Sequence, residues 1–252
     1  MSMERSDNVP RYGNFSATFR PHFQTATLWA ACSDIFTQSQ LAARRVGSEK
    51  FTESHKSIAT ISHNPGLHVL GLVGWGNISK KLAFKGAGGA GNEDSLFLIL
   101  SERMRRKKSS WLRLIMIPWM VADCVTLHTP RNKHTQYLIH SRALSLMKPE
   151  TRIVNTARAS IVNEDALVRA LESKHISAAA LDVHYHEPQV WPTLASMENA
   201  TLTTHIGGGV LETRTNFEWN AMRNIIAVVG ADGDFAGDPL TPVNREAFAA
   251  QG

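Results

Sequence analysis

A strand, a glycine turn and a helix follow one another in HVLGLVGWGNISKKLA, and this succession constrains the fold more than any other stretch of the chain. Residues 67–73 contain an almost continuous apolar run, which is typical of a strand covered on both faces of a parallel sheet. Gly74 and Gly76 allow a tight turn and let backbone N–H groups approach a pyrophosphate, and the helix predicted from Asn77 directs its positive end to the same point. The stretch therefore predicts a dinucleotide-binding turn.

Ser79 stands where the dinucleotide-binding fingerprint has its third glycine. That position serves helix–strand packing rather than phosphate contact, so we expect a serine to be tolerated there. Taken alone, the motif is equally compatible with an ordinary turn between a strand and a helix. The surrounding sequence has to decide between the two.

Strand and helix patterns alternate along the rest of the chain. Short apolar runs that end in turn residues predict strands at 122–130, 152–155, 176–183 and 200–208. Asn163 is a candidate N-cap for a helix with Glu164 and Asp165 in its first turn. A long final helix has an apolar face with helical spacing, formed by Met222, Ile225, Ile226 and Val229. This alternation predicts an α/β fold with a doubly wound parallel sheet.

The composition is that of an ordinary globular protein. The 252 residues can hold one large α/β domain, or one domain and part of another. The longest apolar runs are far shorter than the roughly 20 residues that a membrane span needs, and the N-terminus shows no secretory signal. The two cysteines, Cys32 and Cys124, are too few for a disulfide framework or a structural zinc site. We therefore expect a cytoplasmic protein with no metal and no membrane partner.

The basic run RMRRKK at 103–108 stands out against a modest net charge of +5. Five cations in six residues are compatible with a patch that binds nucleic acid or an acidic partner. No nucleic-acid recognition motif accompanies the run. We interpret it as a solvated loop and expect no nucleic-acid partner.

Five motifs in a fixed order, GLVGWGNIS, LHTP, LMKPETRIVNTARASIVNEDALVRAL, AALDVHYHEP and TTHIGG, resemble those of the D-isomer-specific 2-hydroxyacid dehydrogenases. The chain looks most similar to the branch of fungal glyoxylate reductases and hydroxyisocaproate dehydrogenases, over roughly residues 37–85 and 120–244. The resemblance implies a Rossmann-like domain that binds NAD or NADP, a second substrate (lid) domain and a homodimer. The implied reaction moves a hydride between the nicotinamide cofactor and a small 2-keto or 2-hydroxy acid.

Reduction of a 2-keto acid requires a cation that holds the carboxylate and a proton donor for the carbonyl oxygen. Arg158 suits the first role because a guanidinium is always charged and binds a carboxylate through two parallel hydrogen bonds. His205 suits the second because imidazole titrates near neutral pH, and Glu187 is the candidate carboxylate that would orient the ring and favour its charged form. The resemblance assigns the same roles to these three residues. His184 and His186 lie beside the Glu187 motif, and we expect both to be ordinary loop residues.

The resemblance also implies cofactor contacts for residues at the ends of the predicted strands. They are Gly74, Gly76, Asn77 and Ile78 at the pyrophosphate, Thr129 and Pro130 near the adenosine, Thr156, Ala157 and Arg158 on the nicotinamide side, Asp182 at the carboxamide or the nearby ring edge, and His205, Gly207 and Gly208 beside the ring.

Residues 86–119 depart from the family pattern, because no second strand or following βα unit is recognisable there. Glu102, which follows a short apolar run, lies somewhat late for the acid that binds the ribose. Glu102 would favour NAD, whereas Arg103 and Arg105 would favour NADP, so the choice stays open. Read one base later, codons for Gly91–Asp94 can encode the residues that the family places before its second strand. We therefore hypothesise a reading-frame or splice error.

The N-terminal part departs as well, because NVPRYGN resembles only the end of the lid domain. We expect residues 1–45 to hold a remnant of that domain and the connecting helix, 46–210 the dinucleotide-binding domain, and 211–252 a crossing helix and tail. A site without its lid loses substrate orientation and water exclusion, which would leave the chain inactive. The leading interpretation is a dehydrogenase. The alternative is a non-catalytic NAD(H)-binding or protein-interaction module of the same fold.

Overall fold

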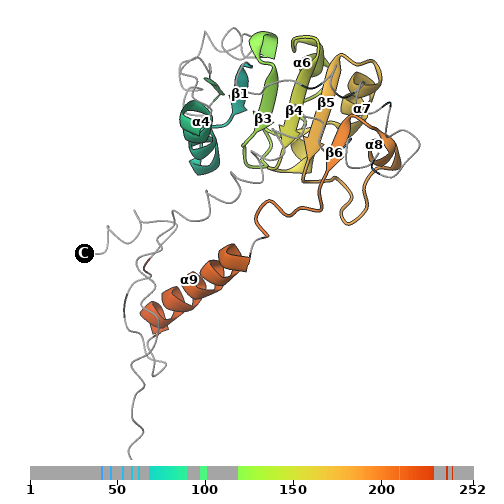
Figure 1. Cartoon of the computed structure of the whole chain (residues 1–252). Coiled ribbons are helices and arrows are strands. Elements are labelled where there is room, and N and C mark those ends of the chain that lie inside the picture. Colours follow the sequence, from blue (N-terminus) through green and yellow to red (C-terminus); the bar gives the residue numbers. More distant parts are fainter. Residues whose placement is uncertain are drawn as a thin grey trace, which may run out of the picture. The chain divides into compact units, whose positions relative to one another are not determined.

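Within the described part of the chain, six strands form one sheet in the order β2-β1-β3-β4-β5-β6, and neighbouring strands are parallel (Figure 1). The strands are β1 (Leu70–Val73), β2 (Phe97–Leu100), β3 (Cys124–Leu127), β4 (Thr151–Asn155), β5 (Ile176–Leu181) and β6 (Ala200–Leu202). The chain runs outward from β1 to β2, returns past β1 to β3, and then continues in the opposite direction to β6. This reversal makes the sheet doubly wound, so the predicted fold class is confirmed.

The structure is a computed structural model that describes residues 68–89, 97–100, 119–209 and 211–229, with a few single positions elsewhere. The chain divides into two compact units, one formed by Pro21–Gly208 and the other by Met1–Arg20 together with Gly209–Gly252. The sheet belongs to the first unit. The predicted lid remnant at 1–45 falls almost entirely outside the described residues, as do the basic run 103–108 and the three residues considered for the choice between NAD and NADP.

Helices connect the strands, as parallel pairing requires. The connecting helices include α4 (Asn77–Gly89), α6 (Ser141–Ser145), the 3₁₀ turn η3 (Ala159–Ile161), α7 (Glu164–Glu172) and α8 (Pro192–Ser196), and α9 (Leu211–Val229) follows the last strand. Helix α7 begins as predicted, because Asn163 is its N-cap and accepts a hydrogen bond from the backbone N–H of Ala166 at 2.8 Å. Glu164 and Asp165 occupy its first turn, where the helix dipole favours negative charge.

Strands β1, β3, β4 and β5 are buried on both faces, which explains their continuous apolar runs. Successive strand residues point to opposite faces. Val125 and Ile153 therefore belong to a large core cluster that includes residues of α6, α7 and α8, whereas their neighbours Cys124 and Val154 belong to a second cluster with Leu82 of α4. Helices on both faces hold the sheet rigid and leave the ends of its strands for a site.

Part of the segment 86–119 is more regular than we expected. Helix α4 continues to Gly89, and β2 pairs with β1 in a parallel register that places Phe97 beside Leu70. The family pattern did not reveal this strand in the sequence, although the short apolar run before Glu102 coincides with it. The physical reason is that FLIL is apolar throughout, and such a run satisfies a buried parallel strand whatever residues flank it.

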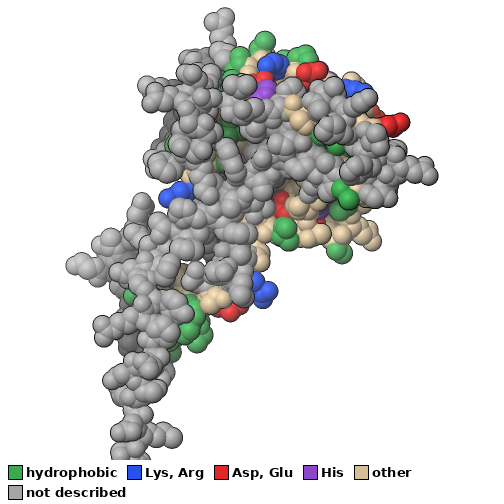
Figure 2. Space-filling view, in the orientation of Figure 1, with side chains coloured by type: hydrophobic (Ala, Val, Ile, Leu, Met, Phe, Trp, Pro, Cys, Tyr) green, Lys and Arg blue, Asp and Glu red, His purple; other side chains and the backbone are tan. Residues whose placement is uncertain are grey.

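Helix α9 confirms the predicted final helix, but its apolar face is open to solvent. Met222, Ile225 and Ile226 are each more than half exposed. Figure 2 shows green side chains on this helix. The helical spacing of apolar residues predicted the element correctly and did not reveal whether its face is covered.

Candidate functional site

A cavity of about 530 Å³ lies at the carboxyl ends of β3 and β4, close to the point where the chain reverses direction in the sheet. Its walls are formed by Ile78, Leu127, His128, Thr129, Pro130, Arg131, Thr156, Ala157 and Arg158. Doubly wound sheets bind their ligands at such a position. Six predicted site residues therefore meet around one cavity: Ile78, Thr129, Pro130, Thr156, Ala157 and Arg158.

The glycine turn beside this cavity uses its two glycines differently. Gly74 has a φ of +107°, and a Cβ there would lie 2.7 Å from the carbonyl oxygen of His128. A Cβ at Gly76 would meet nothing within 4 Å, so the space in front of the turn is open. Ser79 is fully buried in place of the third glycine, and its hydroxyl donates to the carbonyl oxygen of Gly76 at 3.1 Å. Helix α4 then presents its N-terminus, the end that favours anions, to the turn.

Two side chains in the cavity wall fit a bound polar ligand. Among the described residues, the hydroxyl of Thr129 is one of three buried side-chain groups without a hydrogen-bond partner, which is costly unless a ligand or water satisfies it. His128 lies next to it, and burial lowers the pKa of its ring to about 4. Its Nε2 is 3.1 Å from the hydroxyl of Thr126. The open turn, the helix N-terminus and the unsatisfied hydroxyl together fit a dinucleotide cofactor.

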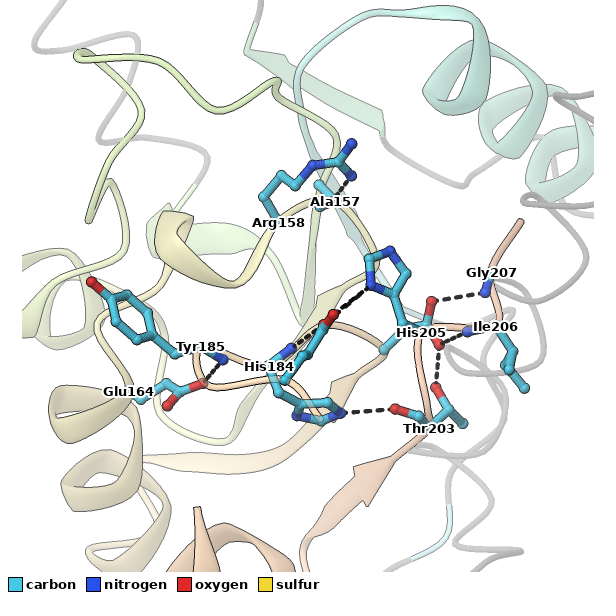
Figure 3. A network of polar contacts seen from close by, with 11 residues as sticks. Ala157, Arg158, Glu164, His184, Tyr185, Thr203, His205, Ile206 and Gly207 are labelled. Atoms are coloured by element: carbon cyan, nitrogen blue, oxygen red, sulfur yellow. Dashed lines mark hydrogen bonds and ion pairs between the residues drawn. The ribbon is translucent and has the colours of Figure 1, made fainter. Parts of the chain in front are cut away.

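Asn155, the last residue of β4, shapes the loop that carries Arg158. Its side-chain amide donates to the carbonyl of Arg158 at 3.0 Å, and its oxygen accepts from the N–H of Ala157 at 3.0 Å. Arg158 itself is exposed, and its Nη1 donates to the carbonyl of Ala157 at 2.6 Å (Figure 3). The guanidinium therefore keeps further donors for an anion at the cavity wall.

His205 and Glu187 meet as predicted. The Nδ1 atom of His205 lies 2.9 Å from Oε2 and 3.1 Å from Oε1 of Glu187 (Figure 3). Hydrogen bonds from His205 and from the backbone N–H of His184 hold the pKa of Glu187 below its ordinary value. A carboxylate at Nδ1 fixes the ring orientation and leaves Nε2 as the nitrogen available for proton transfer.

The loop of His205 is held by Asp182 at the end of β5. The buried carboxylate of Asp182 accepts hydrogen bonds from the hydroxyl of Thr203 at 2.6 Å, the N–H of Ile206 at 2.9 Å and the N–H of Gly207 at 2.8 Å. A Cβ at Gly207 would lie 2.7 Å from the same carboxylate, so a larger residue there would have to displace the side chain of Asp182. Asp182 thus supports the loop of His205, a role that the sequence did not predict. Its contact with the cofactor stays a prediction, as does that of Gly208, which is exposed.

The two histidines that precede Glu187 differ in burial. His186 is exposed, and its ring contacts the edge of Tyr185. His184 is buried, and its Nε2 donates to the carbonyl of Thr203 at 2.8 Å. Sequence reasoning missed His184, as it missed His128 and Asn155. The signal that could have found them is position, because polar residues at the carboxyl ends of parallel strands gather at one edge.

In the part of the chain that the structure describes, no group of three or more His, Cys, Asp or Glu side chains could hold a metal ion. None of the helices described there combines the length and the apolar character that crossing a membrane requires.

A doubly wound parallel sheet with a glycine turn and a cavity at its switch point is a Rossmann-like dinucleotide-binding domain. Comparison with known proteins then identifies the family. Residues 30–207 match the NAD-binding domain of the D-isomer specific 2-hydroxyacid dehydrogenases. The chain belongs to this family.

Individual relatives agree with this assignment. The chain is 32% identical to a glyoxylate reductase of Pyrococcus furiosus over 179 residues, which are 70% of this chain and 51% of that protein. The holo structure of Rhodotorula graminis D-mandelate dehydrogenase superposes with a TM-score of 0.75 at 33% identity, covering 89% of this chain and 66% of the other. A glyoxylate reductase from Paecilomyes thermophila gives a TM-score of 0.74 at 26% identity, with 90% and 67% covered. The chain spans about half the length of the curated relatives it matches.

Proposed function

We propose that this chain carries the cofactor-binding and catalytic residues of an NAD(P)-dependent 2-hydroxyacid dehydrogenase that acts on small D-2-hydroxy acids and 2-keto acids, in the manner of the glyoxylate reductases. The observation that carries the proposal is the pairing of His205 Nδ1 with Glu187 Oε2 at 2.9 Å. The pair lies in loops at the carboxyl edge of the sheet, to which Arg158 also belongs. The reaction needs two groups: a guanidinium that binds the substrate carboxylate, supplied by Arg158, and an oriented imidazole that donates to the carbonyl oxygen, supplied by His205.

The cofactor role falls to the cavity wall and the glycine turn. The N-terminus of α4 with Gly74, Gly76, Asn77 and Ile78 would hold the pyrophosphate. Thr129 and Pro130 would contact the adenosine, with Thr156, Ala157 and Arg158 on the nicotinamide side and Asp182, His205, Gly207 and Gly208 beside the ring. When bound, NAD(P)H supplies the hydride that reduces the carbonyl carbon.

Arg158 and His205 would act on the substrate. The exposed guanidinium of Arg158 would bind the substrate carboxylate through two parallel hydrogen bonds, which orients the neighbouring carbonyl. The protonated ring of His205 would donate from Nε2 to the carbonyl oxygen as the negative charge develops there. Glu187 would remain ionised throughout and stabilise the imidazolium before the transfer.

The direct test is consumption of NADH or NADPH by the purified chain with glyoxylate, hydroxypyruvate or a branched 2-keto acid. We expect oxidation of one of the two cofactors, and the same assay shows which one and which acid is preferred. A folded chain that binds neither cofactor would contradict the proposal. Binding without turnover would instead favour the alternative of a non-catalytic NAD(H)-binding or protein-interaction module. This alternative is compatible with a chain that spans about half of the relatives' length.

The homodimer and the cytoplasmic location implied by the resemblance are further parts of the proposal. Light scattering of the purified chain tests the dimer, and a fluorescent fusion followed in the source cell tests the location. A monomeric mass would remove the dimer without affecting the proposed chemistry.

A further inference from the structure

The ion pair of Glu187 and His205 is too exposed to fix the relative position of its two side chains by itself. The side chain of His205 is 47% exposed and that of Glu187 38%. Ion pairs at this level of exposure contribute little to stability, because water screens the charges and both side chains lose conformational freedom. His205 also has a φ of +57°, a backbone conformation that a residue other than glycine adopts only where its surroundings enforce it. Other contacts must therefore set the distance between the two loops.

His184 links the loop of Glu187 to the loop of His205 by hydrogen bonds. The backbone N–H of His184 donates to Oε1 of Glu187 at 2.9 Å, and the Nε2 of His184 donates to the carbonyl of Thr203 at 2.8 Å (Figure 3). Thr203 lies two residues before His205, whose Nδ1 returns to Glu187. The hydrogen bonds and the short chain segments between them close a ring in which His184 touches both loops.

The ring of His184 is committed to this link. It is 7% exposed, and within the described residues its Nδ1 has no hydrogen-bond partner. Because a carbonyl oxygen can only accept, Nε2 carries the hydrogen of this contact. Within the described residues, the buried imidazole of His184 therefore makes its hydrogen bond to the carbonyl of Thr203.

We propose that His184 is a positioning residue, whose imidazole holds the loop of Glu187 against the loop of His205 so that carboxylate and imidazole meet. The inference rests on the proposed function, in which His205 donates the proton and Glu187 orients it. In this role His184 touches neither substrate nor cofactor. Asp182 also holds the loop of His205, through Thr203, Ile206 and Gly207, so replacing His184 should loosen this loop without unfolding it.

Two substitutions separate the hydrogen bond from the rest of the side chain. In His184→Gln the amide nitrogen takes the place of Nε2 and can still donate to Thr203. In His184→Asn the shorter amide reaches only the position of Nδ1 and cannot. His186→Asn is the matched control, because His186 is an exposed histidine of the same loop.

The readout is the tautomer of His205, measured by NMR on the full chain labelled with ¹⁵N-histidine, at a pH well above the ordinary imidazole pKa. His205→Gln identifies the His205 signals by their loss, and Glu187→Gln gives the spectrum of the ring without its carboxylate. We expect the wild type to favour hydrogen on Nδ1, and His184→Asn to shift the tautomer ratio about tenfold toward that of Glu187→Gln, as for the loss of one hydrogen bond to a charged group. His184→Gln and His186→Asn should keep the wild-type spectrum.

A wild-type tautomer ratio in His184→Asn would overturn the inference. If His184→Asn fails to fold, His184→Gln decides, because a folded Gln variant with the spectrum of Glu187→Gln would also overturn it. Where turnover is measured, His184→Asn should lower kcat about 10- to 100-fold at unchanged NADH affinity. The NMR readout does not depend on turnover. A failure of the proposed function, seen as full activity in His205→Gln, is therefore distinguishable from a failure of this inference.

Discussion

At the scale of single residues, two glycines of one turn serve different purposes. Gly74 is needed by the fold, because its φ is +107° and a Cβ would collide with the carbonyl of His128. Gly76 is not required by the fold in this way, since a Cβ there faces open space. The conformational freedom of Gly74 forms the turn, and the missing side chain of Gly76 keeps space for a ligand.

The two positions should therefore respond in opposite ways. Gly74→Ala should destabilise the protein by about 2 kcal/mol or more, since it adds backbone strain and a steric clash. Gly76→Val should leave the free energy of unfolding nearly unchanged and abolish binding of NAD(H), because its methyl groups occupy the space of the pyrophosphate. Chemical denaturation and a fluorescence titration with NADH measure the two effects. Unchanged NADH affinity in a folded Gly76→Val protein would refute the assignment of the turn.

The proposed catalytic pair of His205 and Glu187 makes a second prediction at this scale. His205→Gln should lower kcat by roughly 10²–10⁴-fold, the usual contribution of general acid–base catalysis. NADH affinity should hardly change, because the lost proton transfer acts in the transition state. Glu187→Gln should retain more activity, since it leaves the imidazole in place. Steady-state kinetics with a 2-keto acid check both variants, and near-wild-type turnover in His205→Gln would mean that the proton comes from elsewhere.

At the scale of elements, helix α7 shows how local signals and packing agree. Its N-cap, its acidic first turn and its buried face of Ala166, Leu167 and Leu171 are all visible in the sequence and all present in the structure. In the chain, the helix connects the loop of Arg158 to β5, and its buried residues share a core cluster with residues of the sheet, so its stability supports the loops of the site.

Loss of the N-cap should weaken this support. Asn163→Ala should cost about 1 kcal/mol of unfolding free energy, because the N–H of Ala166 loses its acceptor. Asn163→Asp keeps an acceptor at the same place and is the matched control. Thermal unfolding compares the three proteins, and an equal loss in both variants would mean that the cap is not the cause.

At the scale of the whole molecule, three titratable groups make the fold sensitive to acid. Burial lowers the pKa of His128 to about 4 from an ordinary 6.5. Burial alone would raise the pKa of Asp123, but hydrogen bonds from Lys148 and from Val69 outweigh it, and the net shift is downward. The pKa of Glu187 is also lowered. In each case the unfolded chain binds protons more readily than the folded one, so the stability present above the unfolded pKa is lost as the pH falls.

For His128 the pH range of this effect lies between the ordinary pKa of 6.5 and the lowered pKa of about 4. Across it the free energy of unfolding should fall with decreasing pH by up to about 1.4 kcal/mol per pH unit. His128→Gln removes the titration and keeps a polar group near Thr126, so its stability should be flatter over this range. Urea denaturation at several pH values makes the comparison. The same slope in both proteins would show that other groups cause the acid sensitivity.

Strands β1 and β3 to β6 and the cap of α7 followed from the sequence alone, and the roles of the residues at the strand ends stay predictions. Periodicity and capping are local properties, and the chemistry of keto-acid reduction together with the family resemblance pointed to Arg158, Glu187 and His205. β2 was missed as an element, since FLIL lies in a segment without the family's motifs and only its pairing with β1 identifies it as a strand.

Tertiary structure alone decided how these residues are supported. His184 and His186 look alike in the sequence, yet one is buried against Thr203 and the other is exposed, because burial depends on which loop packs above each residue. Asp182 reads as a strand end, and only the fold brings Thr203, Ile206 and Gly207 to its carboxylate. Such contacts join residues some twenty positions apart, and a linear pattern carries no information about their distance in space.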